Sequence, residues 1–295
     1  MKNNPLNTND SKRRLSMDRS VAGRIGTTLP KLDVPIQANP PQELLRESLE
    51  MPELSESEIV RYLTQISTFN FSIDHNFYPL GSCTMKYNPK VNDDIAALPG
   101  FSAIHPMQEE STVQGALKLM HDLQNILAEI TGMAGTSLAP MAGAEGELAG
   151  MLMTRAYHQA NGDRKRTKIL VPDSAHGTNP ASAQMVGMKV VVINCDKEGN
   201  VDFEDLKKKA ELHSENLGAL MVTYPSTHGV FETTVKEVCE IIHSHGAFVY
   251  IDGANFNAMV GLCYPGSFGG DVSHLNLHKT FCIPHGGGGP GVGPI

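Results

Sequence analysis

The chain has 295 residues, of which 40% are hydrophobic and 19% charged, so it is long enough to bury the core of one large domain or two. Its formal net charge of −8 argues against a nucleic-acid partner, because phosphate backbones demand a basic surface. No apolar run is long enough for a transmembrane helix, and the N-terminus lacks the apolar centre of a signal peptide. The 5 cysteines are scattered and form no CxxC pair, which favours reduced thiols and a cytoplasmic location.

Residues 1–75 are predicted to form an N-terminal arm, because prolines recur between positions 30 and 52. One amphipathic helix is expected within it. Ser55 is a plausible N-cap with Glu58 three residues later, and apolar residues follow at helical spacing (Ile59, Leu63 and Ile66). We expect an arm of this kind to cover another domain or subunit.

From about residue 110 onward, helix and strand patterns alternate, which predicts an α/β fold with a largely parallel sheet. Gly132 is expected to end the first of these helices, and Asp202 to cap a later one. The predicted helices cover 116–130, 144–157, the region around 181, 202–213 and 234–243. The predicted strands cover 169–171, 190–193, 220–223, 248–251 and 272–277.

Polar residues gather directly after the predicted strands. They lie in 172–179, 224–229 and 252–257, and at His278 and Lys279. In open α/β sheets ligands bind outside the carboxyl ends of the strands, so these loops are expected to converge on one face.

Lys279 and Asp252 are the central pair of this set, because each follows a predicted strand. A lysine amine can form a Schiff base with pyridoxal phosphate (PLP), and a carboxylate can keep the pyridine nitrogen protonated. Taken singly, either residue would most often be a surface lysine or a helix cap. The glycine run 286–289 favours the cofactor, because glycines allow close backbone approach.

Two other segments could contact the same ligand. The small residues of 141–147 open a helix whose free amides could hold a phosphate, although most such turns only serve packing. His176 could stack on a ring, although a loop histidine is more often bonded to backbone.

The loop 224–228 offers hydroxyl groups, or it could equally form a type I turn with Pro225 in its first central position. In the segment 252–255, Gly253 and Ala254 would let a flat ring approach the backbone. A metal site is not predicted, because the paired and clustered histidines lack zinc spacing (His243, His245, His274, His278 and His285).

Five segments resemble glycine decarboxylase, the P-protein of the glycine cleavage system, in its C-terminal half. They are 77–89, 174–183, 224–227, 252–255 and 271–291, and the resemblance extends from about residue 30 to the end. The stretch 29–35 resembles the start of the separate subunit 2 found where the P-protein is split.

The resemblance implies the PLP-dependent transferase fold of type I, with a large domain over 76–295 that is incomplete at its C-terminal end. It implies decarboxylation of glycine with release of CO2, and transfer of the aminomethyl group to the lipoyl group of the H-protein. Subunit 1 of the P-protein would be the partner chain.

The resemblance also implies a role for individual residues. Lys279 would carry the Schiff base, Asp252 would pair with the pyridine nitrogen and His176 would stack on the ring. The phosphate would be held by Gly143, Ala144 and Glu145, the phenolic oxygen by Thr227, and the remaining cofactor contacts would include Ala254, Asn255 and His278. Ser82, Cys83 and Thr84 would line the site.

Two other interpretations stay open at this point. One is a different enzyme with the same cofactor and fold, such as an aminotransferase or a cysteine desulfurase. The other is a non-catalytic subunit that supports a catalytic partner, although both Lys279 and Asp252 are present.

Overall fold

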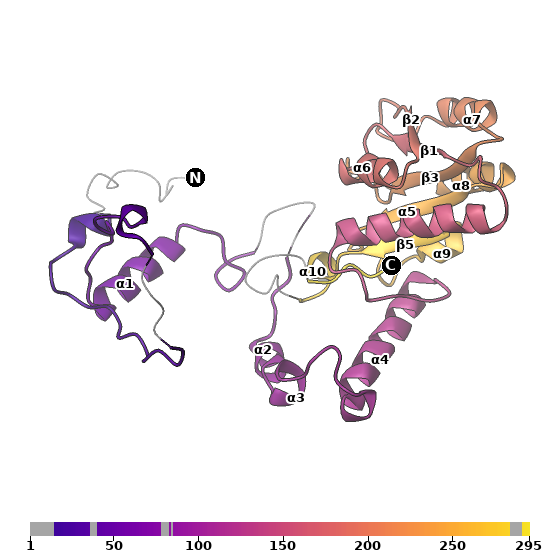
Figure 1. The fold of residues 1–295 in the computed structure, drawn as a ribbon. Helices are drawn as coiled ribbons and strands as arrows, with labels where there is room; N and C mark the ends of the chain where they lie inside the picture. Colours follow the sequence, from indigo (N-terminus) through magenta and orange to yellow (C-terminus); the bar gives the residue numbers. More distant parts are fainter. Residues whose placement is uncertain (1–14, 36–39, 78–82, 84, 284–290) are drawn as a thin grey trace. The chain divides into compact units, whose positions relative to one another are not determined.

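The computed structural model describes residues 15–35, 40–77, 83, 85–283 and 291–295 (Figure 1). The chain divides into two compact units, Met1–Asn76 and Phe77–Ile295. Within the described residues, no helix combines the length and apolar character that crossing a bilayer requires. The cytoplasmic location stays a prediction.

The first unit contains the predicted amphipathic helix, α1 (Glu56–Ser67), and two short 3-10 turns, η2 (Met17–Arg19) and η3 (Gln42–Leu44). The Ser55 and Glu58 side chains form the expected capping box at the start of α1. Leu54 is the one apolar side chain that is buried among the described residues of this unit. A segment with so little core of its own fits an arm, but its covering role stays a prediction.

The second unit is built on five parallel strands in the order β2-β1-β3-β4-β5 (Figure 1). This confirms the predicted α/β fold with a parallel sheet. The strands are β1 (Lys168–Pro172), β2 (Lys189–Ile193), β3 (Leu217–Thr223), β4 (Phe248–Gly253) and β5 (Val272–Leu275).

The five helices predicted in this unit begin and end close to the predicted positions, whereas the short helices at 90–96, 99–102, 265–268 and 277–280 were not predicted. Gly132 ends α4 in the left-handed conformation with φ 68°, and the Asp202 carboxylate accepts hydrogen bonds from the first amides of α7. The elements are α2 (Lys90–Ala96), α3 (Pro99–Ser102), η4 (Glu110–Thr112), α4 (Gln114–Thr131), α5 (Gly143–Ala160), α6 (Thr178–Met185), α7 (Phe203–Leu212), α8 (Val235–Ser244), α9 (Pro265–Phe268) and α10 (Leu277–Thr280).

The last strand is shorter than predicted, because Leu277 begins α10 instead of ending β5. The Lys279 amide donates to the Asn276 carbonyl, which turns the chain out of the sheet. Leu275 and Leu277 continue the period-2 alternation of a strand, so the apolar pattern alone could not place this boundary.

Alternating side chains of the strands build two separate cores, one on each face of the sheet. Ile169, Met221 and Tyr250 belong to the cluster that α5 and α6 cover. Leu170, Leu220 and Ile251 belong to the cluster that includes residues of α4, α7 and α8. Figure 1 shows α5 and α6 in front of the sheet and α8 behind it.

Close approach of α5 to the sheet gives a test of this packing. A Cβ at Gly150 would lie 2.4 Å from Cε2 of the fully buried Tyr250 ring. Gly150→Ala is therefore expected to lower the free energy of unfolding by about 1–3 kcal/mol through overpacking. Gly115→Ala in α4 is the control, because nothing lies within 4 Å of the added methyl group. Urea unfolding of both variants measures the difference, and equal stability would contradict this packing.

Candidate active site

Three polar residues lie side by side where β3, β4 and β5 approach their carboxyl ends. The register pairs Thr223 with Asp252, and Asp252 with His274. Asp252 is two residues beyond Tyr250 on the same strand, so it faces the α5 side of the sheet. This row is the base of the site that the sequence predicted at this edge.

The Asp252 carboxylate is almost fully buried, with 3% of its surface exposed. Its Oδ2 accepts a hydrogen bond from the Thr223 hydroxyl at 3.2 Å, and its Oδ1 accepts one from the Ala254 amide at 3.1 Å. Burial without donors would disfavour an anion, and these donors offset that cost. The site therefore supplies this buried carboxylate with one donor from β3 and one from the loop after β4.

His274 is completely buried beside Asp252. Its Nδ1 lies 2.7 Å from the Tyr250 hydroxyl, and its Nε2 lies 3.6 Å from Asp252 Oδ1 and 3.7 Å from Glu147 Oε1. Burial is the main cause that lowers the pKa of His274, although the charge of Asp252 acts in the opposite direction. The imidazole is therefore neutral near pH 7.

Glu147 enters the site from the first turns of α5 and is 4% exposed. Its Oε1 accepts from the Thr178 hydroxyl at 2.8 Å. The Asn179 amide, with its nitrogen turned toward the two acids, donates to Glu147 Oε2 at 3.1 Å and to Asp252 Oδ2 at 3.2 Å. Burial, followed by the negative charge of Asp252, raises the pKa of Glu147 to about 7.

Lys279 lies on α10, immediately after β5, and is half-buried. Its positive charge acts on Glu147. It lowers the pKa of that carboxyl group, against the larger effects of burial and of the charge of Asp252. Its carbonyl accepts a hydrogen bond from Lys86 Nζ at 2.7 Å. The structure thus brings Lys279 toward Glu147, the acid of α5 that lies beside Asp252.

His176 lies in the loop between β1 and α6 and is exposed. Its Nδ1 is 2.7 Å from the Thr178 hydroxyl, which also contacts Glu147. This hydrogen bond engages one ring nitrogen of an exposed imidazole, so the face of the ring stays available to a ligand. Its stacking role stays a prediction.

The start of α5 lies next to the segment that carries Lys279. A Cβ at Gly143 would be 2.0 Å from Asn276 Oδ1, so only glycine fits this contact. The first amides of a helix have no partner inside it, which leaves those of Gly143, Ala144 and Glu145 available. The Glu145 carboxylate turns back to accept from the Met141 amide at 2.6 Å.

The remaining residues that were predicted to contact the cofactor differ in their burial and in the elements that carry them. Ala254 lies at the site, because its amide bonds Asp252 and its carbonyl accepts from the Asn276 amide at 3.2 Å. His278 is buried on α10, and Asn255 is half-buried in the loop after β4. Thr227 is exposed, on a turn in which the Gly229 amide donates to the Ser226 carbonyl. That turn lies beyond the position expected for one centred on Pro225.

Some predicted residues cannot be placed. Ser82, Thr84 and the glycine run 286–289 lie outside the described residues. Cys83 is half-buried, and its thiol lies 3.8 Å from the Met85 sulfur.

Four residues of the cluster were not assigned a role in the site from sequence. Glu147, Asn179, Thr223 and His274 meet Asp252 through strand register and through helices that cross the sheet. Ligand-type atoms of Glu147, Asp252 and His274 all lie within 4.8 Å of one another. Hydroxyl and amide donors already occupy the carboxylates, which favours a proton over a metal ion. The prediction that the chain has no metal site stays a prediction.

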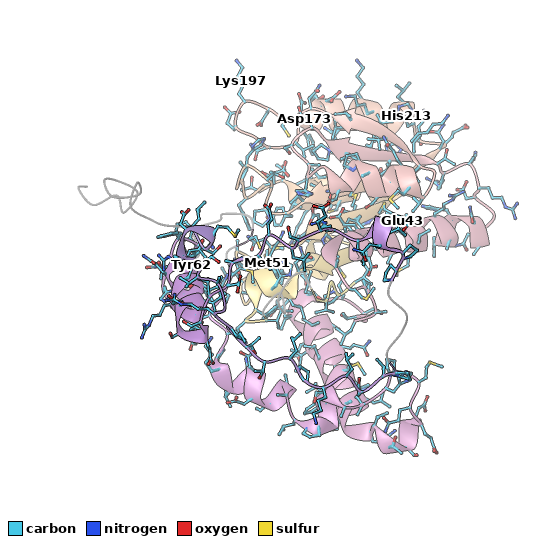
Figure 2. All side chains as sticks on the ribbon, turned by 60° about the vertical axis from the view of Figure 1, so that its left-hand side comes forward. Glu43, Met51, Tyr62, Asp173, Lys197 and His213 are labelled. Carbon is cyan, nitrogen blue, oxygen red and sulfur yellow. The ribbon has the colours of Figure 1, made fainter. Side chains whose placement is uncertain are left out.

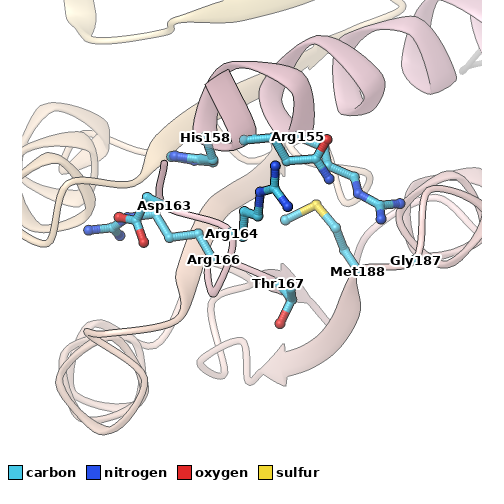
Figure 3. Close-up of a pocket in the computed structure, with 9 residues that line it drawn as sticks. Arg155, His158, Asp163, Arg164, Arg166, Thr167, Gly187 and Met188 are labelled. Carbon is cyan, nitrogen blue, oxygen red and sulfur yellow. The ribbon is translucent and has the colours of Figure 1, made fainter. Parts of the chain in front are cut away.

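A small hollow at the other end of the strands has a structural explanation (Figure 3). Arg155 and Arg166 line it, but both guanidinium groups donate to backbone carbonyls, those of Val186, Leu217 and His245. Figure 2 labels residues from both ends of the strands, with Asp173 just after β1 and His213 just before β3. Thr167 and Met188 also line the hollow and directly precede β1 and β2, so it lies at the opposite end of the strands from Asp252.

Tyr250 gives a direct test of the buried row. Tyr250→Phe removes the hydroxyl that meets His274 Nδ1, which leaves a buried nitrogen without that partner. The free energy of unfolding is expected to fall by about 1–3 kcal/mol. Tyr157→Phe is the matched control, since Tyr157 is 54% exposed, and about 0.5 kcal/mol or less is expected there. Similar effects in both variants, measured by urea unfolding, would rule out the buried hydrogen bond.

The three-layer arrangement is the fold of the PLP-dependent enzymes of fold type I. A crystal structure of glycine decarboxylase (P-protein) of the glycine cleavage system, in inhibitor-bound form, is similar with a TM-score of 0.65 and 22% identity, over 86% of this chain and 55% of that one. The structure of Oryza sativa TDC with PLP and tryptamine is similar with a TM-score of 0.61 and 15% identity, over 86% of this chain and 58% of that one.

The chain belongs to the glycine cleavage system P-protein family, whose model matches residues 23–295. It is 54% identical over 285 residues to the probable glycine dehydrogenase (decarboxylating) subunit 2 of Halalkalibacterium halodurans, covering 95% of this chain and 58% of that relative. The chain therefore spans little more than half the length of such relatives.

Proposed function

We propose that this chain is part of an enzyme that decarboxylates glycine with PLP and transfers the aminomethyl group to the lipoyl group of the H-protein. The observation that carries this proposal is the placement of Asp252 at the carboxyl end of β4 and of Lys279 just after β5, on two neighbouring parallel strands. Membership of the P-protein family supports the choice of glycine over other amino acids. Subunit 1 of the P-protein would be its partner, as the name of the relative implies.

The residues present fit PLP on three counts. A half-buried lysine amine is available for covalent attachment, a buried acid with several donors can remain an anion, and a helix N-terminus offers free amides for a phosphate. When bound, PLP supplies an aldehyde that captures amines and a ring that accepts the electrons released with CO2.

The protein residues would position and polarise this group. Lys279 would hold it covalently and would accept or return a proton at Nζ when glycine enters or leaves. Asp252 would keep a proton on the ring nitrogen, because its charge is fixed by Thr223 and Ala254. His176 would cover one face of the ring, and the first amides of α5 would hold the phosphate. Thr227 would meet the phenolic oxygen, and Asn255 and His278 would supply further contacts.

Lys279→Ala is expected to abolish covalent capture of PLP by the full-length subunit assembled with its partner. Borohydride reduction of the loaded protein, followed by peptide mass spectrometry, should place the label on Lys279 in the wild type. Lys236→Ala changes an exposed lysine on α8 and should leave the label in place. Retention of the reduced label in Lys279→Ala would remove Lys279 from this role.

Asp252→Ala is expected to keep some cofactor but to lose decarboxylation, by about 100-fold or more, the size of effect seen when one preorganised electrostatic group is removed. The measurement is CO2 release from glycine that depends on the lipoylated carrier. Near-normal turnover would refute the assignment. Turnover of a keto acid without the carrier would favour an aminotransferase instead.

A further inference from the structure

Glu147 is a second carboxyl group in the buried cluster, and the proposed chemistry leaves it without a task. It is 4% exposed and Asp252 is 3% exposed, and the Asn179 amide bridges the two acids. Two negative charges this close in a buried site repel strongly, so a shared proton is expected on one of them.

The donors around the two acids decide which one keeps the proton. Thr223, Ala254 and Asn179 all donate to Asp252, whereas Glu147 accepts from Thr178 and Asn179. More donors stabilise the anion more, so Asp252 is the better place for the charge. Glu147 is the better place for the proton.

His274 does not neutralise either acid. Burial raises the pKa of the Tyr250 hydroxyl well above its ordinary value, so this group stays protonated and donates to His274 Nδ1. The proton of the neutral imidazole is then on Nε2, which lies 3.6 Å and 3.7 Å from the two carboxylates. His274 thus directs an N–H dipole toward both acids without adding a full positive charge.

We propose that Glu147 is a positioning residue of the cofactor site, which holds a proton up to about neutral pH so that Asp252 alone presents a negative charge to the ring nitrogen. This inference rests on the proposed function. The charged and titratable groups that act on Glu147 or on its neighbour His274 come from β4 (Asp252 and Tyr250), β5 (His274), α10 (Lys279) and the β1–α6 loop (His176).

The proton can be observed without cofactor or substrate. Infrared difference spectra of the full-length, cofactor-free subunit in complex with its partner should show a buried protonated carboxyl group that disappears as the pH rises through about 7. Glu147→Gln should lack this signal at every pH. Glu129→Gln changes an exposed acid on α4 and should retain it.

Coupling to Asp252 is tested by Asp252→Asn. The charge of Asp252 is the second cause of the raised pKa of Glu147, so the carboxyl signal should titrate at a lower pH in this variant. An unchanged titration would overturn the coupling. A wild type without the signal, or a Glu147→Gln protein that retains it, would overturn the proton assignment.

Cofactor binding supplies a second measurement. Glu147→Gln imitates the protonated acid, so its affinity for PLP should match that of the wild type at about pH 6, roughly one unit below the expected titration. Glu147→Ala should bind about 10- to 100-fold more weakly, as expected when the support of a ligand-binding group is lost. Equal losses in both variants would overturn the proposal.

A metal ion is the competing occupant. Elemental analysis that finds a stoichiometric divalent ion in the wild type, and none in Glu147→Gln, would overturn the proton assignment. The infrared result does not depend on the glycine reaction, so it would stand even if that reaction failed. The proposed function is tested separately, by the reduced PLP label on Lys279.

Discussion

The register of the parallel sheet is the constraint on which the site depends. Because β3, β4 and β5 pair residue by residue, the inward-facing positions near their ends fall in one row, Thr223, Asp252 and His274. Each neighbour then supplies a polar group to Asp252 from a fixed direction. A slip of one residue in β4 would turn Asp252 to the opposite face of the sheet.

A buried carboxylate anion needs hydrogen-bond donors at fixed positions around it. Desolvation disfavours a carboxylate, and only donors at hydrogen-bond distance offset the cost. Thr223 and the Ala254 amide meet that requirement from β3 and from the loop after β4. The same low-dielectric surroundings make the second acid, Glu147, unsuited to a charge of its own. The environment thus supplies more hydrogen-bond donors to Asp252 than to Glu147.

The sequence was sufficient to predict the strands, the parallel sheet and the position of Lys279 after the last strand. These features follow from period-2 and period-3.6 patterns and from strand ends, which are local. Asp252 was expected just after its strand, but β4 extends two residues further and includes it. Thr223 was missed because the hydroxyl was sought in the following loop, at Thr227. His274 was considered only as a metal ligand, although its place on the same face as Asp252 depends on the register between strands.

Glu147 shows why the remaining contacts could not be found from local patterns. It lies in the segment 141–147, whose small residues suggested a phosphate site made of free amides. The glycines of this helix also serve contact with the sheet, because a Cβ at Gly146 would lie 3.1 Å from the His274 Cβ and one at Gly150 2.4 Å from Tyr250.

Gly143, Gly146 and Gly150 recur at helical spacing, so they line one stripe of α5 along the sheet. A helix that approaches this closely brings the next side chain, Glu147, within reach of the buried row. The same stripe places the helix N-terminus against the segment that carries Lys279, through the contact of Gly143 with Asn276. One close helix–sheet contact therefore fixes both the free amides and the second acid relative to Asp252.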